Sequence, residues 1–328
     1  MHVARRVIII TLALLVTGAV LAAYLAPYTY PEFEYRLQGP EIAVVPKPAV
    51  PVAGRWIDDY FIVEEIDPTT IAIGEPRYYQ GNYSYLIMGG ERAVLFDAGT
   101  GTRDIVPVVR SLTGLPITVL PSHLHFDHVG AVGRFERTAL LDVPSLRARI
   151  RNSSLTLERY EFLGFVQGLA TPTFRVDEWW VAGATVDLGN RRVRVLSTPG
   201  HTPSSVSLYD EERQQLFVGD FIYPGPLYAF LPGASRSAYL ATTRRLLSQV
   251  PPTVRIYTAH MADPPAAVRA PVLEFADLKA LEATLVAIEQ GTLDPIEPGG
   301  SPAPAFFPRV FPVRGSVTLA TGFRWNNR

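Results

Sequence analysis

The chain contains no cysteine, which excludes disulfides, nucleophilic thiols and thiolate metal ligands. A metal site would therefore use imidazole and carboxylate groups, a ligand set that suits Zn²⁺, with manganese, iron or cobalt as substitutes. Lysine is also scarce, since Lys47 and Lys279 are the only two, and the formal net charge is -1 at pH 7. This balance gives no electrostatic reason to expect a nucleic-acid partner.

Histidine is scarce too, and its distribution is uneven. The chain has six histidines, and three of them fall in the segment His123-Leu124-His125-Phe126-Asp127-His128. Two histidines separated by one residue point the same way from extended backbone, whereas the adjacent Asp127 and His128 diverge. The segment can thus present ligands to two neighbouring metal sites, which a polar loop that is rich in histidine by chance would not explain.

The first 27 residues predict a membrane anchor or signal segment. Arg5 and Arg6 precede an uncharged, largely aliphatic run from Val7 to Ala26, which is long enough to cross a hydrocarbon core of roughly 30 Å as a helix. The arginines favour a cytoplasmic N-terminus, so the rest of the chain would lie on the outer, extracytoplasmic side of the membrane. A signal peptide that is cleaved, leaving a secreted protein, is the alternative.

Composition divides the remainder into three parts. Residues 28–54 are rich in proline and are interpreted as an extended linker. Residues 55–292 alternate β-like and helical patterns and form the predicted catalytic domain, with 48% hydrophobic residues in the chain as a whole to build its core. Residues 293–328 are a Pro/Gly-rich C-terminal extension, with an edge strand expected near 317–320.

Within the predicted domain, strands alternate with helices. A hairpin is expected from Tyr83–Met88 to Ala93–Phe96, followed by a helix over 105–112 and a strand over 117–120, which together form a crossover unit. Residues 144–167 are predicted to be helical, with Tyr160, Phe162 and Phe165 on an apolar face. Further helices are expected over 236–249 and 272–289. Two strand-rich halves of this kind indicate a layered α/β body with two sheets between helices.

Potential ligands follow several of the predicted strands. Asp97 ends one strand, and His201 is exposed at the sharp turn Thr198-Pro199-Gly200 after another. Asp220 and His260 each end a further strand. Since α/β proteins usually build their sites at the carboxyl ends of strands, this ordered set together with the histidine cluster predicts a metal centre.

These motifs resemble the metallo-β-lactamase superfamily over roughly residues 55–290. The resemblance implies a four-layer αββα fold, with two central mixed β-sheets flanked by helices. It also implies two metal ions, most simply Zn²⁺, of which the first would be held by His123, His125 and His201. Asp127, His128 and His260 would hold the second, with Asp220 bridging the two. Ala259 departs from the glycine that often precedes the last histidine, which concerns loop geometry rather than ligation.

The ligand set predicts a metal-dependent hydrolase. Two neighbouring cations lower the pKa of a shared water and polarise a substrate carbonyl or phosphoryl oxygen. The hydroxide so formed would attack the carbonyl, Asp127 would move the proton, and Asp97 would fix a histidine or loop from behind.

The segment after Asp220 bears on the substrate, which is expected to be a small molecule. Tyr223 is placed similarly to a catalytic tyrosine of the lactonases within the superfamily, whose hydroxyl could steady an oxyanion, and the alternative is a core aromatic. Leu227, Tyr228 and Phe230 either form an apolar rim or close the domain. An ester, thioester or lactone with an apolar acyl part is therefore favoured. The alternatives are an iron-dependent sulfur (persulfide) dioxygenase, a β-lactam or phosphodiester hydrolase, and a non-catalytic metal-binding module.

Overall fold

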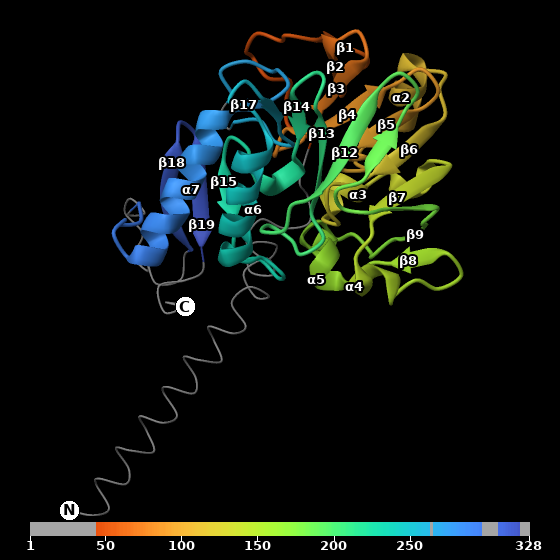
Figure 1. The fold of residues 1–328 in the computed structure, drawn as a ribbon. Coiled ribbons are helices and arrows are strands. Elements are labelled where there is room, and N and C mark those ends of the chain that lie inside the picture. Colours follow the sequence, from red (N-terminus) through yellow and green to blue (C-terminus); the bar gives the residue numbers. More distant parts are fainter. Residues whose placement is uncertain (1–43, 263–264, 297–307, 322–328) are drawn as a thin grey trace, which may run out of the picture.

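Two large β-sheets packed face to face form the body of the protein (Figure 1). The computed structural model describes residues 44–262, 265–296 and 308–321. Side chains from both sheets meet in one buried cluster, in which Tyr85 and Phe96 of the first sheet lie against Phe217 of the second, with ring centroids 5.2 and 6.4 Å apart. The alternating apolar residues of the predicted strands supply this shared core.

The first sheet contains the N-terminal strands and the predicted crossover unit. Its order is β1-β2-β3-β4-β5-β6-β7-β10. The expected hairpin joins β4 to β5, and β5, β6 and β7 run parallel because α2 (Val106–Leu112) crosses between β5 and β6. The strands are β1 (Arg55–Trp56), β2 (Ile62–Asp67), β3 (Thr70–Glu75), β4 (Asn82–Met88), β5 (Ala93–Phe96), β6 (Ile117–Leu120), β7 (Arg137–Leu141) and β10 (Glu178–Trp180).

The second sheet has the order β11-β12-β13-β14-β16-β17. All its neighbours are antiparallel except β14 and β16, which are parallel because α6 (Arg236–Gln249) lies between them in the chain. The strands are β11 (Thr185–Asp187), β12 (Arg192–Ser197), β13 (Val206–Asp210), β14 (Gln215–Phe217), β16 (Arg255–Tyr257) and β17 (Val272–Glu274).

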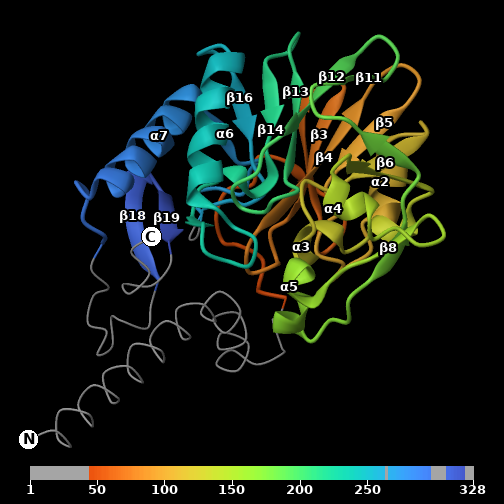
Figure 2. The ribbon, with the colours of Figure 1, turned by 60° about the horizontal axis from the view of Figure 1, so that its bottom comes forward.

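Helices cover the outer faces of both sheets. Figure 2 shows α6 and α7 (Phe275–Gln290) on one side of the strands and α2, α3 (Phe126–Val129) and α4 (Pro144–Arg147) on the other. Leu240 and Leu246 of α6 and Leu281 of α7 are buried against the second sheet, and Val109 of α2 is buried against the first. The four-layer αββα architecture predicted from the sequence is therefore confirmed.

The prediction of one helix over residues 144–167 is wrong. The region contains the short helices α4 and α5 (Arg159–Phe162), a 3-10 turn over Gly164–Gln167, and the strand β8 (Ser154–Thr156), which pairs with β9 (Thr173–Arg175) just beyond the region. Asn152, Ser153 and Leu163 have φ angles of 50°, 60° and 56°, and this left-handed backbone interrupts a helix. Phe162 and Phe165 are nevertheless buried, as their apolar spacing indicated.

The strand expected near 317–320 is present as β19 (Val317–Thr321), but it is not an edge strand. It lies in the middle of a small sheet, between β15 (Pro226–Tyr228) and β18 (Arg309–Arg314). The parallel pairing with β15 includes bonds from Thr318 N to Gly225 O (2.9 Å) and from Ala229 N to Ala320 O (2.8 Å). This part of the C-terminal extension thus packs onto the segment that follows Asp220.

The prediction of a transmembrane anchor, and of an enzyme held on the outer side of a membrane, is contradicted for the part of the chain that the structure describes. Residues 1–27 lie outside the described ranges, and within those ranges no helix has the length and apolar character to cross a bilayer. The longest described helix, α7, has 16 residues, whereas a span requires about 20. Residues 44–54 of the predicted linker contact the domain, for example through Ala53 N to Val268 O at 2.9 Å.

Candidate metal centre

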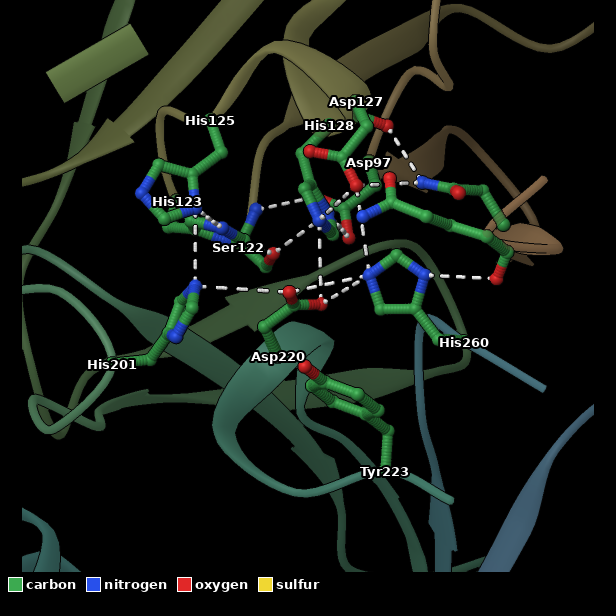
Figure 3. A network of polar contacts seen from close by, with 12 residues as sticks. Asp97, Ser122, His123, His125, Asp127, His128, His201, Asp220, Tyr223 and His260 are labelled. Atoms are coloured by element: carbon green, nitrogen blue, oxygen red, sulfur yellow. Dashed lines mark hydrogen bonds and ion pairs between the residues drawn. The ribbon is translucent and has the colours of Figure 1, made fainter. Parts of the chain in front are cut away.

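The carboxyl ends of strands from both sheets bring all the predicted ligands to one place (Figure 3). Strand β6 leads into the histidine segment, whose second half forms α3. Strands β12, β14 and β16 of the other sheet lead to the remaining three. Every one of these side chains is buried, with 6% or less of its surface exposed; they are His123, His125, Asp127, His128, His201, Asp220 and His260.

Three imidazoles form the first group. His125 Nδ1 lies 2.9 Å from His123 Nε2 and 3.0 Å from His201 Nε2. Ligand atoms of these three residues all lie within 4.8 Å of one another, so they could hold one metal ion. The structure therefore brings His201, from the second sheet, together with the two histidines of the first.

Asp127, His128 and His260 form a second group of possible ligands. Asp127 Oδ2 lies 3.4 Å from His128 Nε2 and 3.5 Å from His260 Nε2. Asp220 stands between the two groups: its Oδ1 is 3.0 Å from His260 Nε2 and 3.3 Å from His128 Nε2, while its Oδ2 is 3.7 Å from His201 Nε2. A carboxylate in this place can contact metals on either side.

Asp97 lies behind the second group. Its Oδ2 is 2.9 Å from His128 Nδ1, and its Oδ1 accepts a bond from Ser122 N at 2.6 Å. Asp97 has a φ of 65°, a conformation that costs free energy in a residue other than glycine and is common at functional sites. Because Asp97 engages Nδ1, the ring of His128 is oriented with Nε2 toward the other ligands.

Several partners of the ligands were not predicted from the sequence. Ser122 Oγ lies 3.0 Å from His123 Nδ1, and the carbonyl oxygens of Tyr228 and Gln80 lie 3.3 Å from the Nδ1 atoms of His201 and His260. Asn82 donates a hydrogen bond to Asp127 Oδ2 at 3.0 Å. No motif marks these residues; the only signal is that Asn82 and Ser122 are polar residues within or directly after apolar strands.

Burial keeps the first group neutral. It lowers the pKa of His123 well below the usual value and that of His125 to about 3, and each is lowered further by the neighbouring imidazoles. Burial also lowers the pKa of His201, against the attraction of Asp220. Neutral imidazole is the form that binds metal, so this group is ready to bind at neutral pH.

The second group carries charge in the metal-free chain. Burial opposes protonation of His128 and His260, but the nearby carboxylates outweigh it and raise the pKa of both. Burial likewise opposes ionisation of Asp220, yet His260 and His128 hold its pKa well below the usual value. Among the described residues, His128 Nε2 and Asp220 Oδ1 are buried and make no contact with hydrogen-bond geometry, although they lie only 3.3 Å from each other. Such orphaned atoms fit a site for cations that these atoms would contact.

Zinc binding should therefore release protons unequally from the two groups. We expect fewer protons from the first group than from the second, because the raised pKa of His128 and of His260 favours their protonated forms, which must lose a proton before they can bind a metal. Lowering the pH should consequently weaken the second metal before the first. Calorimetric titration in buffers of different ionisation enthalpy measures the protons released, and equal release in both steps would contradict this assignment.

A sequence model of the metallo-beta-lactamase superfamily matches residues 78–260, which is more than half of the chain and includes the six ligand histidines and aspartates from His123 to Asp220 as well as His260. The chain belongs to the metallo-β-lactamase superfamily. The prediction of the family and of a metal-dependent hydrolase is confirmed at this level: the family binds metal ions, and the described residues include His/Asp groups that could hold one.

Curated relatives within the superfamily include named thioesterases. Acyl-coenzyme A thioesterase MBLAC2 of Homo sapiens is 30% identical over 205 residues, which cover 54% of this chain and 72% of that protein. A hydroxyacylglutathione hydrolase of Synechococcus is 27% identical over 192 residues, covering 55% and 63% of the two chains. These names describe those proteins.

Solved structures of the superfamily share the fold. A metallo-beta-lactamase from Pontibacter korlensis superposes with a TM-score of 0.51 at 18% identity, covering 69% of this chain and 99% of that one. A metallo-beta-lactamase family protein from Thermus thermophilus also gives 0.51, at 19% identity, covering 70% and 83%. At these identities the likeness concerns the fold alone.

Tyr223 lies beside the candidate metal centre, and Figure 3 shows its hydroxyl directed toward Asp220. Its ring centroid is 4.9 Å from that of His260, and its hydroxyl donates to Pro226 O at 2.5 Å. Burial raises the pKa of Tyr223 well above the usual value, as does the charge of Asp220. Tyr223 is thus a neutral donor at the edge of the site whose proton is engaged by the following loop.

The apolar residues after Tyr223 differ in their surroundings. Leu227 is fully buried and packs in one cluster with Val317 and Leu319 of the C-terminal strand, so it closes the domain. Tyr228 is partly buried, contacts Phe230 with ring centroids 5.9 Å apart, and presents its carbonyl to His201. The sequence left open whether these residues form an apolar rim of the site or close the domain. Leu227 closes the domain, and Tyr228 lies next to the site.

Proposed function

We propose that this member of the metallo-β-lactamase superfamily is a dinuclear metal hydrolase that cleaves a carbonyl substrate, with a thioester as the favoured class among ester, thioester and lactone. The observation that carries the proposal is the set of seven buried ligands with Asp220 between two groups. The names of the thioesterase relatives favour the thioester. The backbone carbonyl of Tyr228 lies 3.3 Å from His201 Nδ1, so the apolar segment after Asp220 runs next to the first group, which favours a substrate with an apolar part.

In the proposal, His123, His125 and His201 would hold one metal, Asp127, His128 and His260 would hold the other, Asp220 would serve both, and Asp97 supports His128. Two such cations, most simply Zn²⁺, would supply an acidified water and polarise the carbonyl oxygen. Water adds to the carbonyl carbon and the carbon–sulfur bond breaks, which gives a carboxylic acid and a thiol. Asp127 accepts a proton from the water and returns it to the departing sulfur.

The proposal is tested with the full chain, loaded with zinc and assayed against a panel. An acyl-coenzyme A, an acylglutathione, a lactone, a β-lactam and a phosphodiester are compared at equal concentration, and bound metal is measured in the same preparation. We expect two metals per chain and the highest kcat/KM for one of the thioesters. Less than one metal per chain, turnover confined to the phosphodiester, or oxygen consumption by an iron-loaded sample with a persulfide would each overturn the proposal.

Tyr223→Phe separates the two interpretations of Tyr223. We expect both metals to stay bound and kcat to fall by less than about tenfold, because the hydroxyl proton is engaged by Pro226 O. An oxyanion donor is typically worth about 10²- to 10³-fold in kcat. A loss of that size for carbonyl substrates, with metal content unchanged, would instead support the catalytic role predicted from the sequence.

A further inference from the structure

Asn82 lies where the two halves of the site meet. It is the first residue of β4, and its backbone forms an antiparallel bridge with His260. Bonds on either side extend this pairing, from Tyr83 N to Ala259 O at 2.7 Å and from Met261 N to Gly81 O at 3.2 Å. The backbone of Asn82 thus sets the position of a ligand that comes from the other sheet.

The side chain of Asn82 holds a second ligand. Its Nδ2 donates to Asp127 Oδ2 at 3.0 Å and to the backbone oxygen of Asp127 at 3.1 Å. Asn82 is 2% exposed, so water does not compete for its amide. Both hydrogen bonds of Asn82 Nδ2 go to Asp127, and together they fix the side chain of Asp127 relative to the backbone of Asp127.

The oxygen that Asn82 contacts is the one that faces the second group. Asp127 Oδ2 is also the atom 3.4 Å from His128 Nε2 and 3.5 Å from His260 Nε2. A carboxylate oxygen has two lone pairs, and the amide engages one while the other remains directed at the site. Lysine or arginine could orient Asp127 equally well, but either would bring a positive charge next to a cation.

The first group has different supports. Ser122 contacts His123, and the Tyr228 carbonyl lies near His201. Among the described residues, the hydrogen bonds of the Asn82 side chain go to Asp127 and its backbone bridge goes to His260, and both partners belong to the second group.

We propose that Asn82 is a positioning residue for the second metal: its amide orients Asp127 and its backbone places His260, so that it controls the affinity of that metal and leaves the first unaffected. The proposal rests on the dinuclear site described under Proposed function. It predicts a split between two binding constants, which a general role in stability would not produce.

The test is a competitive titration of the metal-free chain with Zn²⁺ against a chelator, which yields both stepwise dissociation constants without an activity assay. In Asn82→Ala we expect the second metal to bind about 10- to 100-fold more weakly, the range usual for outer partners of ligands, with the first constant within about threefold. Asn82→Ser keeps a hydroxyl donor and most of the packing, so its affinity for the second metal should fall less. It replaces the alanine variant in the titration if that variant folds poorly.

Tyr85→Phe is the matched control. Tyr85 is on the same strand and donates a buried hydrogen bond across the sheets, to Thr258 O at 2.6 Å, but it contacts no ligand. We expect it to lower the melting temperature without changing either constant. Equal weakening of both metals in the Asn82 variants, or no weakening, would overturn the inference while leaving the dinuclear proposal intact; a wild-type chain that binds one metal would overturn both.

Discussion

Replacing Asp220 by alanine is expected to remove metal from both groups and to lower kcat/KM by at least about 10³-fold, beyond the ~10- to 100-fold typical of outer partners. The carboxylate of Asp220 contacts histidines of both groups, with Oδ1 at 3.0 Å from His260 Nε2 and Oδ2 at 3.7 Å from His201 Nε2. The substitution also removes a carboxylate that lies 3.3 Å from the charged His128, so we do not expect it to stabilise the metal-free fold.

Metal analysis and steady-state kinetics on the same sample check this expectation. Asp142→Ala is the control, because Asp142 forms an ion pair with Arg147 at the surface, at 2.7 Å, and touches no ligand. That variant should keep two metals and nearly full activity, since exposed ion pairs contribute little. If Asp220→Ala retained two metals with kcat/KM within tenfold of the unaltered chain, Asp220 would not be a shared ligand.

Asp127→Asn is expected to weaken the second metal and to lower kcat by about 10²- to 10⁴-fold, the range of a general acid–base group. The substitution keeps the shape of the side chain but removes the charge that faces His128 and His260. It also removes the group that accepts a proton from the attacking water. The substitution thus affects metal binding and proton transfer at once, so the experiment must separate these two effects.

Two measurements achieve the separation. Assays at saturating zinc restore the second metal, and the activity still missing then reports on proton transfer. The deficit should be smaller for thioesters of more acidic thiols, whose sulfur departs with less need of a proton. A variant that regains full activity with every substrate at saturating zinc would show that Asp127 acts as a ligand without moving protons.

The candidate ligands could be picked out from the sequence because their signal is local. Scarce histidines and isolated aspartates at the ends of apolar strands are visible without knowledge of the fold, and the order of strands and helices indicated the layers. The supports of the ligands depend instead on contacts between distant segments. Asn82 and Asp127 are 45 positions apart, and His201 and Tyr228 are 27 apart, so neither pair leaves a pattern in the chain.

The errors have physical reasons of the same kind. The apolar spacing of Phe162 and Phe165 is compatible with a helix, but left-handed backbone at Asn152 and Leu163 turns the chain instead. The strand at 317–321 has little alternation of its own, and its central place depends on β15, which contributes only three residues. Tertiary partners, rather than local propensity, decide both regions.

The pairing of β19 with β15 has a consequence for the biogenesis of the enzyme. The Tyr228 carbonyl beside His201 belongs to β15, and β15 is hydrogen-bonded to a strand made near the end of the described chain. On the ribosome, the three histidines of the first group emerge long before β19, the strand that holds β15 beside them. The Tyr228 carbonyl is therefore expected to reach its final place beside His201 only after residue 321 has been translated and β19 has paired with β15, which is a late event in the life of the nascent chain.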